Sequence, residues 1–302
     1  MMITISRRAL RTAVLWRAMR AHQWAKNLLI FVPLVLGGRS TEANVWLHAI
    51  EAFGAFSLLA SAVYLMNDIR DLQVDRQHWS KRRRPLASGE LSVADGRKLI
   101  VICCLGAAAT ALIAGWGCVE ILAIYLAASL VYTFWLKREP IVDVFILSAL
   151  YTLRLGLGVV ATNVRFSPWL FVFSIFIFLS LSLAKRQTEI ARLLMRGEEF
   201  MPGRGYRASD GPLVLTMGVA AMIAAVLVLV IYLIEDAFPF GFYAHPELLW
   251  GIAVIMFLWL SRIWLLCHRG QLDDDPVAFA LKDRLSLFYA AMVGAIFVAA
   301  VL

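Results

Sequence analysis

The chain has 302 residues, of which 61% are hydrophobic and 17% charged, and it carries a formal net charge of +8. Soluble domains are about half apolar and about a quarter charged, so this composition excludes an ordinary soluble globular protein and indicates a polytopic membrane protein. The four cysteines lie in or beside apolar segments without metal-ligand spacing, so neither a disulfide framework nor a cysteine metal site is expected.

Residues 1–26 form a basic, slightly amphipathic segment before the first apolar run. This segment lacks the long apolar core and the small-residue cleavage site of a signal peptide, so we expect it to stay in the mature protein.

Nine apolar runs follow, each close to the roughly 20 residues that a membrane-spanning helix needs. The first run is the weakest, because Pro33 and the pair Gly37-Gly38 interrupt it. Few long polar stretches remain between the runs. We therefore predict one all-α integral membrane domain over residues 1–302. The runs lie near residues 27–47, 48–67, 98–116, 119–136, 141–161, 168–185, 213–234, 247–267 and 285–302.

Lysine and arginine are concentrated in the N-terminal segment and in the loops after the second, fourth, sixth and eighth runs. The other loops contain little basic charge beyond Arg39 and Arg165. Because cytoplasmic loops of membrane proteins carry an excess of Lys and Arg, this asymmetry predicts a cytoplasmic N-terminus. It places the charged loop after the second run on the same side.

An acidic group ends the second apolar run, in the stretch "NDIRDLQVD". On a helix at 100° per residue, Asp68, Asp71 and Asp75 fall within about 60° of one another. Three ionised carboxylates on one face repel each other unless a cation compensates them. Mg²⁺ prefers carboxylate oxygens and water and is often shared with substrate phosphates. We therefore predict that these aspartates bind Mg²⁺ and act in catalysis, with Asn67 beside them.

A basic run, Lys81 to Arg84, follows the aspartates. Lys81, Arg82 and Arg84 are candidates to bind phosphate oxygens, which pair well with ammonium and guanidinium groups. The alternative is a solvated loop that only obeys the positive-inside rule. With the metal, the acids and the basic run predict a site for a diphosphate.

A second charged segment, "LAKRQTEIARLLMRGEE", follows the sixth run. Lys185, Glu189, Arg192 and Arg196 share one helical face, so a single carboxylate lies among several cations. The alternative is a surface ion pair between Lys185 and Glu189, which contributes only a few tenths of a kcal/mol. The segment is expected on the same membrane side as the aspartates, and Glu189 is a further candidate catalytic residue.

Arg154 lies inside the fifth run, where charges are costly and often functional. It is a candidate to contact a phosphate, and an interhelical structural role is equally open. Asp275 and Asp283 are expected to cap helices. Further candidate substrate-binding residues, beside Lys185, are Tyr132, Lys137 and Arg186.

The stretch "NDIRDLQVD" resembles the NDxxDxxxD motif of the UbiA-type intramembrane prenyltransferases, and "KRRRPLASGELS" resembles the basic loop after it. The resemblance implies nine transmembrane helices arranged around a central polar cavity that opens to the cytoplasmic side. It implies that the three aspartates hold Mg²⁺ against a pyrophosphate leaving group. The basic loop would then grip the pyrophosphate, and Lys26 and Asn27 would border the donor site.

The chain departs from that family at the second motif, because the usual DxxxD after the sixth span is absent. Several segments are instead similar to the decaprenyl-phosphate phosphoribosyltransferase branch, and with the Asp motif this resemblance extends over most of the chain. These segments are "QWAKNLLIFVPL", "VYTFWLKREPIVD", "SLAKRQTEI", "GRGYRASD" and "DDPVAFALKDR".

This second resemblance implies Mg²⁺-dependent transfer of 5-phosphoribose from phosphoribosyl pyrophosphate to a polyprenyl (decaprenyl) phosphate, with release of pyrophosphate. It implies a bacterial inner membrane enzyme whose product leads toward arabinose donors for the cell envelope. The expected partners are phosphoribosyl pyrophosphate, the lipid phosphate and membrane lipids, without nucleic acid. The attacking lipid phosphate oxygen is already anionic, so no nucleophile from the protein is required, which agrees with five scattered histidines.

Two alternatives remain from the sequence. An aromatic prenyltransferase would move a prenyl chain onto an acceptor such as 4-hydroxybenzoate, and the absent second motif argues against it. A secondary transporter would place its acidic residues near the bilayer midplane, often with internal repeats, and neither feature is visible here. The lipid chain length, the number of Mg²⁺ ions, the oligomeric state and a substituting role for Glu189 are left open by the sequence.

Overall fold

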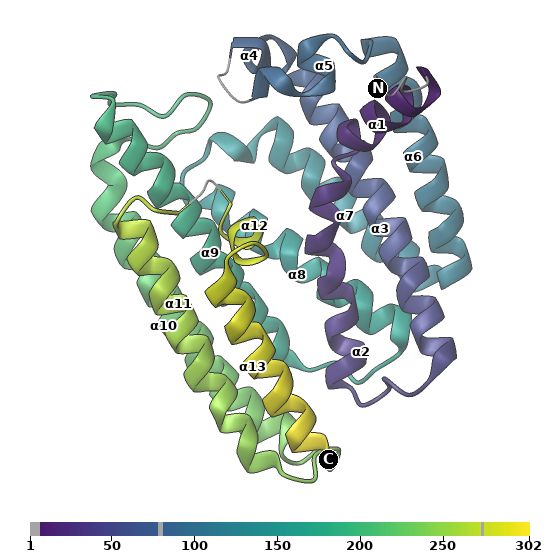
Figure 1. Ribbon diagram of the computed structural model, residues 1–302, viewed down its shortest axis with the longest axis vertical. Helices are drawn as coiled ribbons and strands as arrows, with labels where there is room; N and C mark the ends of the chain where they lie inside the picture. Colours follow the sequence, from purple (N-terminus) through teal and green to yellow (C-terminus); the bar gives the residue numbers. More distant parts are fainter. Residues whose placement is uncertain (1–6, 78–80, 273–274) are drawn as a thin grey trace, which may run out of the picture. The chain divides into compact units, whose positions relative to one another are not determined.

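The computed structural model describes residues 7–77, 81–272 and 275–302. His78 and Asp273 lie outside the described residues. Within them, all regular structure is helical, and β-type pairing is limited to one bridge between Phe200 and Arg207 (Figure 1). The predicted all-α class is thus confirmed.

In the described part of the chain, eight helices are long and apolar enough to cross a membrane. The predicted boundary between the first two runs, at residues 47 and 48, is wrong. The chain instead turns at residues 37–42, and the helix α3 runs without a break from Ala43 to Arg70. The turn forms where Gly38 adopts a positive φ of 70°, a conformation that favours glycine.

A shorter helical stretch precedes this turn. It consists of the 3₁₀ helix η1 (Ala21–Phe31) and the α-helix α2 (Val32–Leu36). A 3₁₀ helix rises about 2.0 Å per residue, against about 1.5 Å in an α-helix, so the stretch extends about 30 Å. That length is close to the thickness of the hydrocarbon core, about 30 Å. A ninth crossing therefore stays a prediction.

The chain divides into two compact units. The first unit comprises Met1–Thr133 and Arg154–Val164, and the second comprises Phe134–Leu153 and Arg165–Leu302. The helix α8 (Val142–Thr162) contributes residues to both. The other helices of the first unit are α1 (Arg7–Ala18), η1, α2, α3, α4 (Leu72–Gln77), η2 (Lys81–Arg83), α5 (Pro85–Ser88), α6 (Val93–Ala114) and α7 (Trp116–Phe134). The second unit holds η3 (Leu136–Arg138), α9 (Pro168–Met195), η4 (Ala208–Asp210), α10 (Gly211–Tyr232), η5 (Leu233–Ala237), η6 (Pro246–Leu249), α11 (Trp250–His268), α12 (Pro276–Ala280) and α13 (Arg284–Val301).

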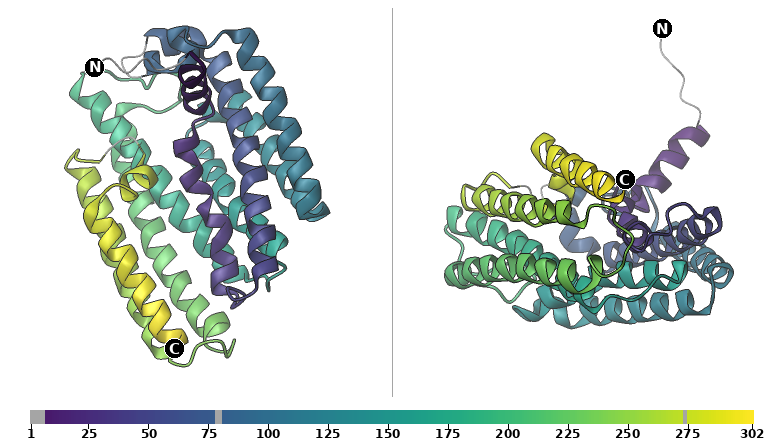
Figure 2. Two further views of the ribbon diagram at one scale, coloured as in Figure 1. Left: turned by 45° about the vertical axis from the view of Figure 1, so that its right-hand side comes forward. Right: turned by 90° about the horizontal axis from the view of Figure 1, so that it is seen from below.

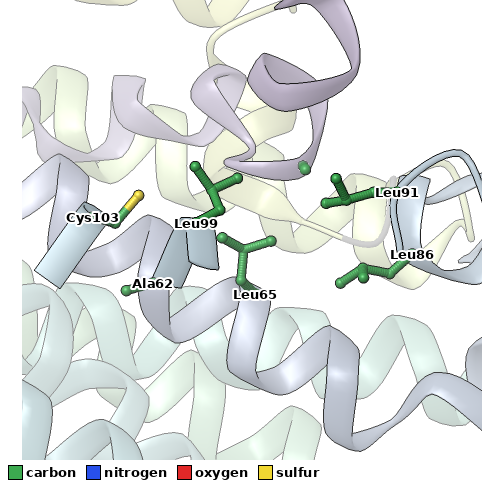
Figure 3. Close-up of a cluster of buried hydrophobic side chains, with 7 residues drawn as sticks. Ala62, Leu65, Leu86, Leu91, Leu99 and Cys103 are labelled. Carbon is green, nitrogen blue, oxygen red and sulfur yellow. The ribbon is translucent and has the colours of Figure 1, made fainter. Parts of the chain in front are cut away.

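In the first unit, a buried apolar cluster joins α3, α5 and α6. Leu65 of α3 packs with Leu99 and Cys103 of α6, and Leu86 of α5 belongs to the same cluster (Figure 3). Burial of such leucine side chains stabilises a fold by roughly 1.5–3 kcal/mol each in water-soluble proteins. Here the cluster fixes the short helix α5 against the end of α3. This contact brings Arg84, the residue before α5, close to Asp68 of α3 and Asp75 of α4.

In the second unit, α9 and α10 pack side by side, and α11 lies between this pair and α13 (Figure 2, right). The indole Nε1 of Trp264 on α11 donates to Ser180 Oγ on α9 at 2.9 Å. A Cβ added at Gly218 of α10 would overlap the same indole ring. The absence of a side chain at Gly218 therefore lets Trp264 join the three helices.

Close packing at one glycine gives a testable prediction for the fold. A Cβ at Gly158 on α8 would overlap the carbonyl oxygen of Ile30 on η1. We expect Gly158→Ala to destabilise the protein by about 1–3 kcal/mol, because overpacking displaces the backbone. A Cβ added at Gly54 on α3 would meet no atom within 4 Å. Gly54→Ala should therefore be neutral or slightly stabilising. Thermal unfolding in detergent compares the two, and equal melting temperatures would contradict the prediction.

Candidate functional site

The acidic group of the first unit is buried, with Asp68 exposed by 4% and Asp75 by 2%. One nitrogen of Arg84, Nη1, donates to both carboxylates, at 3.0 Å to Asp68 Oδ1 and 2.6 Å to Asp75 Oδ2. Arg20 also donates to Asp68 Oδ1. The prediction that Asp68 and Asp75 share one face is confirmed, since both reach the same guanidinium atom.

A kink interrupts the helical segment that carries the acidic group. The helix α3 ends at Arg70 and α4 begins at Leu72, and a ψ of 12° at Asp71 turns the backbone between them. Helical hydrogen bonding nevertheless continues, because Asp71 N–H donates to Asn67 O at 2.9 Å and Asp75 N–H donates to Asp71 O at 2.8 Å. Asp71 and Asn67 are half-buried at this kink. The contacts described here join Asp68 and Asp75, and the role of Asp71 as a third carboxylate of the site stays a prediction.

The donor set at this place fits a hard cation. Two carboxylates that converge on one positively charged atom offer the oxygen ligands that Mg²⁺ prefers. In the structure, the guanidinium of Arg84 supplies the positive charge between them. Among the described residues, no group of three His, Cys, Asp or Glu side chains is gathered as a metal site. Asp68 and Asp75 would therefore need water or substrate oxygens to complete the coordination of Mg²⁺.

Arg20 was not a predicted site residue. It lies just before η1 in a left-handed conformation, with φ 54° and ψ 45°, which is uncommon for a non-glycine residue. Its guanidinium carbon lies 5.1 Å from the ring centroid of Tyr64 on α3, and its Nη2 reaches Asp68. The sequence indicates the contact of Arg20 with Asp68 only through the basic segment before the first apolar run, to which Arg20 belongs. That segment does not reveal which arginine turns toward the acids.

The basic run separates into two kinds of position. Arg82 and Arg83 are exposed in η2 and Lys81 is half-buried, whereas Arg84 turns toward Asp68 and Asp75. Pro85, which follows Arg84, is buried, so the backbone is anchored at this point. The structure thus brings Arg84 to the acids. For Lys81 and Arg82, phosphate binding stays a prediction.

A second polar group of the first unit surrounds Arg154, which is 5% exposed. Its Nε donates to Asn27 Oδ1 at 2.9 Å, and its guanidinium carbon lies 4.7 Å from the ring centroid of Phe56. Asn27 Nδ2 in turn donates to Ser57 Oγ at 2.9 Å. Lys26, next to Asn27, is also buried. The predicted candidates Asn27 and Arg154 are therefore brought together although 127 positions separate them.

The second unit contains a buried ionic network at the start of α8 and near the end of α9. Arg186 is fully buried, and its Nε donates to Asp143 Oδ2 at 2.8 Å. The same arginine forms an ion pair with Glu189. Lys185 and Arg204 also interact electrostatically with Glu189. Glu189 is thus surrounded by cations, of which Lys185 was predicted on its helical face and Arg186 and Arg204 were not.

Asp143 accepts two more hydrogen bonds from the loop after α9, from Arg204 Nη1 at 3.2 Å and from Tyr206 OH at 2.7 Å. Burial, together with the neighbouring Asp143 carboxylate, raises the pKa of Tyr206, so its hydroxyl keeps the proton that it donates. Arg204 and Tyr206 were not predicted as site residues. Their only sequence signal is the segment "GRGYRASD", which carries the family resemblance without revealing a partner.

Three further predicted substrate-binding residues are only partly buried. Tyr132 on α7 and Lys137 in η3 are half-buried, and so is Lys185 on α9. The expected capping roles are confirmed, because Asp275 Oδ1 accepts from Val277 N–H at 3.1 Å and Asp283 Oδ2 accepts from Ser286 N–H at 2.8 Å.

Comparison with known proteins gives consistent matches over most of the chain. The model of a family described as UbiA prenyltransferase family matches residues 27–292. A protein of Sinorhizobium fredii named "Uncharacterized protein y4nM" is 40% identical over 93% of this chain, which spans 55% of that protein's length. The nodulation protein NoeC of Azorhizobium caulinodans is 34% identical over 89% of this chain and 87% of its own. Decaprenyl-phosphate phosphoribosyltransferase of Mycobacterium tuberculosis is 32% identical over 92% of both chains.

Solved structures share the fold. A UbiA homolog from Archaeoglobus fulgidus bound to GPP and Mg²⁺ superimposes with a TM-score of 0.69 and 15% identity, covering 94% of this chain and 99% of that one. A UbiA homolog from Aeropyrum pernix superimposes with a TM-score of 0.64 and 20% identity, covering 93% and 96%. At these identities the likeness concerns the arrangement of helices.

Proposed function

The chain belongs to the UbiA prenyltransferase family, and from this premise we propose that it transfers 5-phosphoribose from phosphoribosyl pyrophosphate to a polyprenyl phosphate, releasing pyrophosphate. The observation that carries the proposal is the ionic network of the second unit. There, three cations (Lys185, Arg186 and Arg204) accompany two carboxylates (Asp143 and Glu189). An excess of cations suits a donor with more phosphate than a prenyl diphosphate. The relatives named decaprenyl-phosphate phosphoribosyltransferase, at 30–32% identity, also support this donor.

In the proposed reaction, the bond between ribose C1 and the pyrophosphate oxygen breaks, and a bond forms between C1 and an oxygen of the lipid phosphate. The bonding electrons leave with pyrophosphate, so negative charge develops on the leaving group. Fixed cations lower the energy of such a transition state. Arg84 and Arg20, which donate to Asp68 in the structure, would be the residues that contact pyrophosphate oxygens.

The proposed metal is Mg²⁺, which when bound supplies positive charge at the leaving pyrophosphate. Asp68 and Asp75 would hold it, and Asp71 at the kink is the third candidate. The lipid phosphate oxygen is already anionic, so no residue has to remove a proton from it. This proposal places the reaction in a bacterial plasma membrane, with the site open to the cytoplasm where a soluble phosphorylated donor is found.

The test is an assay of the purified protein in detergent. It is incubated with Mg²⁺, phosphoribosyl pyrophosphate labelled in the ribose and a polyprenyl phosphate, and pyrophosphate release and lipid labelling are followed. We expect equal amounts of pyrophosphate and labelled lipid, and loss of both products when EDTA removes the metal. A parallel arm offers a prenyl diphosphate with 4-hydroxybenzoate. Prenylation of this acid without lipid labelling would overturn the proposal, and so would the absence of turnover in both arms.

A further inference from the structure

The helix η1 keeps 3₁₀ geometry over eleven residues, Ala21–Phe31. Runs of 3₁₀ helix longer than three or four residues are uncommon, so contacts with neighbouring elements have to stabilise this one. Within the first unit, η1 packs against α3. Arg154 and Gly158 of α8, which belong to the same unit, also lie against it.

The 3₁₀ geometry brings η1 into register with α3. Three residues of a 3₁₀ helix rise about 6 Å, and so do four residues of an α-helix. Trp24 Nε1 donates to Ser61 Oγ at 3.0 Å. Three residues later, Asn27 Nδ2 donates to Ser57 Oγ at 2.9 Å, four residues back along α3. The spacing of the two serines thus matches a 3₁₀ helix and stabilises it.

The same register holds η1 against α8. Asn27 Oδ1 accepts from Arg154 Nε at 2.9 Å. Three residues later in η1, the carbonyl oxygen of Ile30 lies so close to Gly158 that a Cβ there would overlap it. Gly158 is four residues after Arg154, which is again a rise of about 6 Å. Asn27 is therefore the residue of η1 whose side chain joins α3 to α8.

The partners of Asn27 determine which way its amide points. A guanidinium has only donors, so Arg154 Nε requires the amide oxygen as its partner. The amide nitrogen then faces Ser57, whose hydroxyl oxygen accepts from it. Ser57 is 0% exposed and Asn27 2%, so bulk water does not compete for these bonds. Ser57 thereby ensures that oxygen, not nitrogen, faces Arg154.

The direction of the Arg154 guanidinium depends on this oxygen. Its central carbon lies 4.7 Å from the ring centroid of Phe56 and 5.7 Å from that of Tyr125. Attraction to a ring face holds a cation near the ring, whereas a hydrogen bond to Nε is directional. The bond to Asn27 therefore orients the guanidinium over the rings.

We propose that Ser57 is a positioning residue of the reaction, which orients Asn27 so that Asn27 directs Arg154 toward the donor. This inference rests on the proposed function and on the predicted phosphate contact of Arg154, and it assigns Ser57 no contact with the substrate. Ser61 supports the arrangement, because it accepts from Trp24 and donates to the carbonyl oxygen of Ser57 at 2.8 Å.

The experiment uses calorimetry with Mg²⁺ present to measure the Kd of two probes, phosphoribosyl pyrophosphate and geranyl diphosphate. Ser57→Ala should raise the Kd of the probe that the wild type binds about three- to tenfold, because Asn27 loses its acceptor and holds Arg154 less well. Ser148→Ala is the matched control. Ser148 is also 0% exposed, and its hydroxyl donates to the backbone carbonyl of Ile175. This control should lower thermal stability similarly and change the Kd less than about twofold.

A double-mutant cycle separates positioning from a general loss of stability. If Ser57 acts through Arg154, adding Ser57→Ala to Arg154→Met should leave the Kd of the single variant unchanged and still lower its melting temperature. An equal fold increase in Kd in both backgrounds would overturn the inference, and so would an unchanged Kd for Ser57→Ala alone. If Arg154→Met does not fold, Arg154→Lys takes its place, since lysine lacks the Nε that Asn27 holds.

The two probes separate this inference from the proposed function. Binding of geranyl diphosphate alone would overturn the proposed donor, while the cycle measured with that probe would still decide the role of Ser57. Binding of phosphoribosyl pyrophosphate without coupling between Ser57 and Arg154 would keep the proposed donor and reject the inference. If the wild type binds neither probe, both are rejected.

Discussion

Asp68→Asn is expected to lower the rate of transfer about 10³-fold while leaving the protein folded. Asp68 is 4% exposed and converges with Asp75 on one cationic atom, so its negative charge is part of the proposed Mg²⁺ site. Asparagine has the same shape but holds a divalent cation weakly, because it contributes no charge. Loss of one fixed electrostatic contact at a developing charge costs about 10²–10³-fold in rate, and loss of the metal costs more.

The measurement compares initial rates of lipid labelling across a range of Mg²⁺ concentrations. We expect the Mg²⁺ concentration for half-maximal rate to rise for Asp68→Asn, since fewer charges hold the ion. Asp95→Asn is the matched control, because Asp95 is a carboxylate of the first unit whose side chain is 43% exposed and which pairs with Lys98. Its rate should stay within about twofold of wild type. A rate near wild type for Asp68→Asn would reject the metal assignment.

Replacing Arg154 by methionine is expected to lower kcat/KM about 10²-fold. Arg154 is buried against Phe56 and donates to Asn27, so the variant loses a cation in a place with little water. If Arg154 binds a phosphate, as the sequence suggests, the loss concerns a charge-assisted contact of several kcal/mol in a desolvated site. Methionine keeps the length and apolar volume of the stem, which limits the loss of packing.

Two comparisons make this second prediction specific. Arg154→Lys should not restore activity, because an ammonium cannot reproduce both the stacking on the ring and the directed bond to Asn27. Arg165→Met, at an exposed arginine between α8 and α9, should behave as wild type. The measurements are kcat/KM for the donor and thermal unfolding in detergent. If Arg154→Met loses stability but keeps kcat/KM, Arg154 has a structural role between η1 and α8.

Much of the candidate site follows from local spacing. Helical periodicity brings Asp68 and Asp75 to one side even across a kink, because the hydrogen bonds from Asp71 and Asp75 continue the helical pattern. Spacing does not reveal the kink itself, since the backbone changes direction at Asp71, where ψ is 12°, without any break in composition. In the same way, apolar composition indicates that residues 27–67 lie in the membrane, but it predicts the turn between the two runs at the wrong place. The turn is set by backbone conformation at Gly38.

The partners of the charged residues could not be read from the sequence. Arg20 and Asp68 are 48 positions apart, and Asp143 is 43 positions from Arg186 and 63 from Tyr206. The charge pattern predicts that a buried acid pairs with a cation, but it does not show which of the many arginines is the partner. Which one is chosen depends on how close the helices and loops approach, as at Gly205, where the absence of a side chain lets the loop reach the turn before α8.

The amino-acid order alone predicts an all-helical membrane protein with an acidic group and a basic second segment. These features depend on composition, periodicity and charge, which can be read along the chain. Packing in three dimensions was needed to show that Arg84 and Arg20 meet Asp68, that Asn27 meets Arg154, and that Arg186, Arg204 and Tyr206 meet on Asp143. These contacts depend on the packing of whole helices. Because these groups are buried, each contact affects the stability of the fold. A charge that is removed from water must be paired inside the protein.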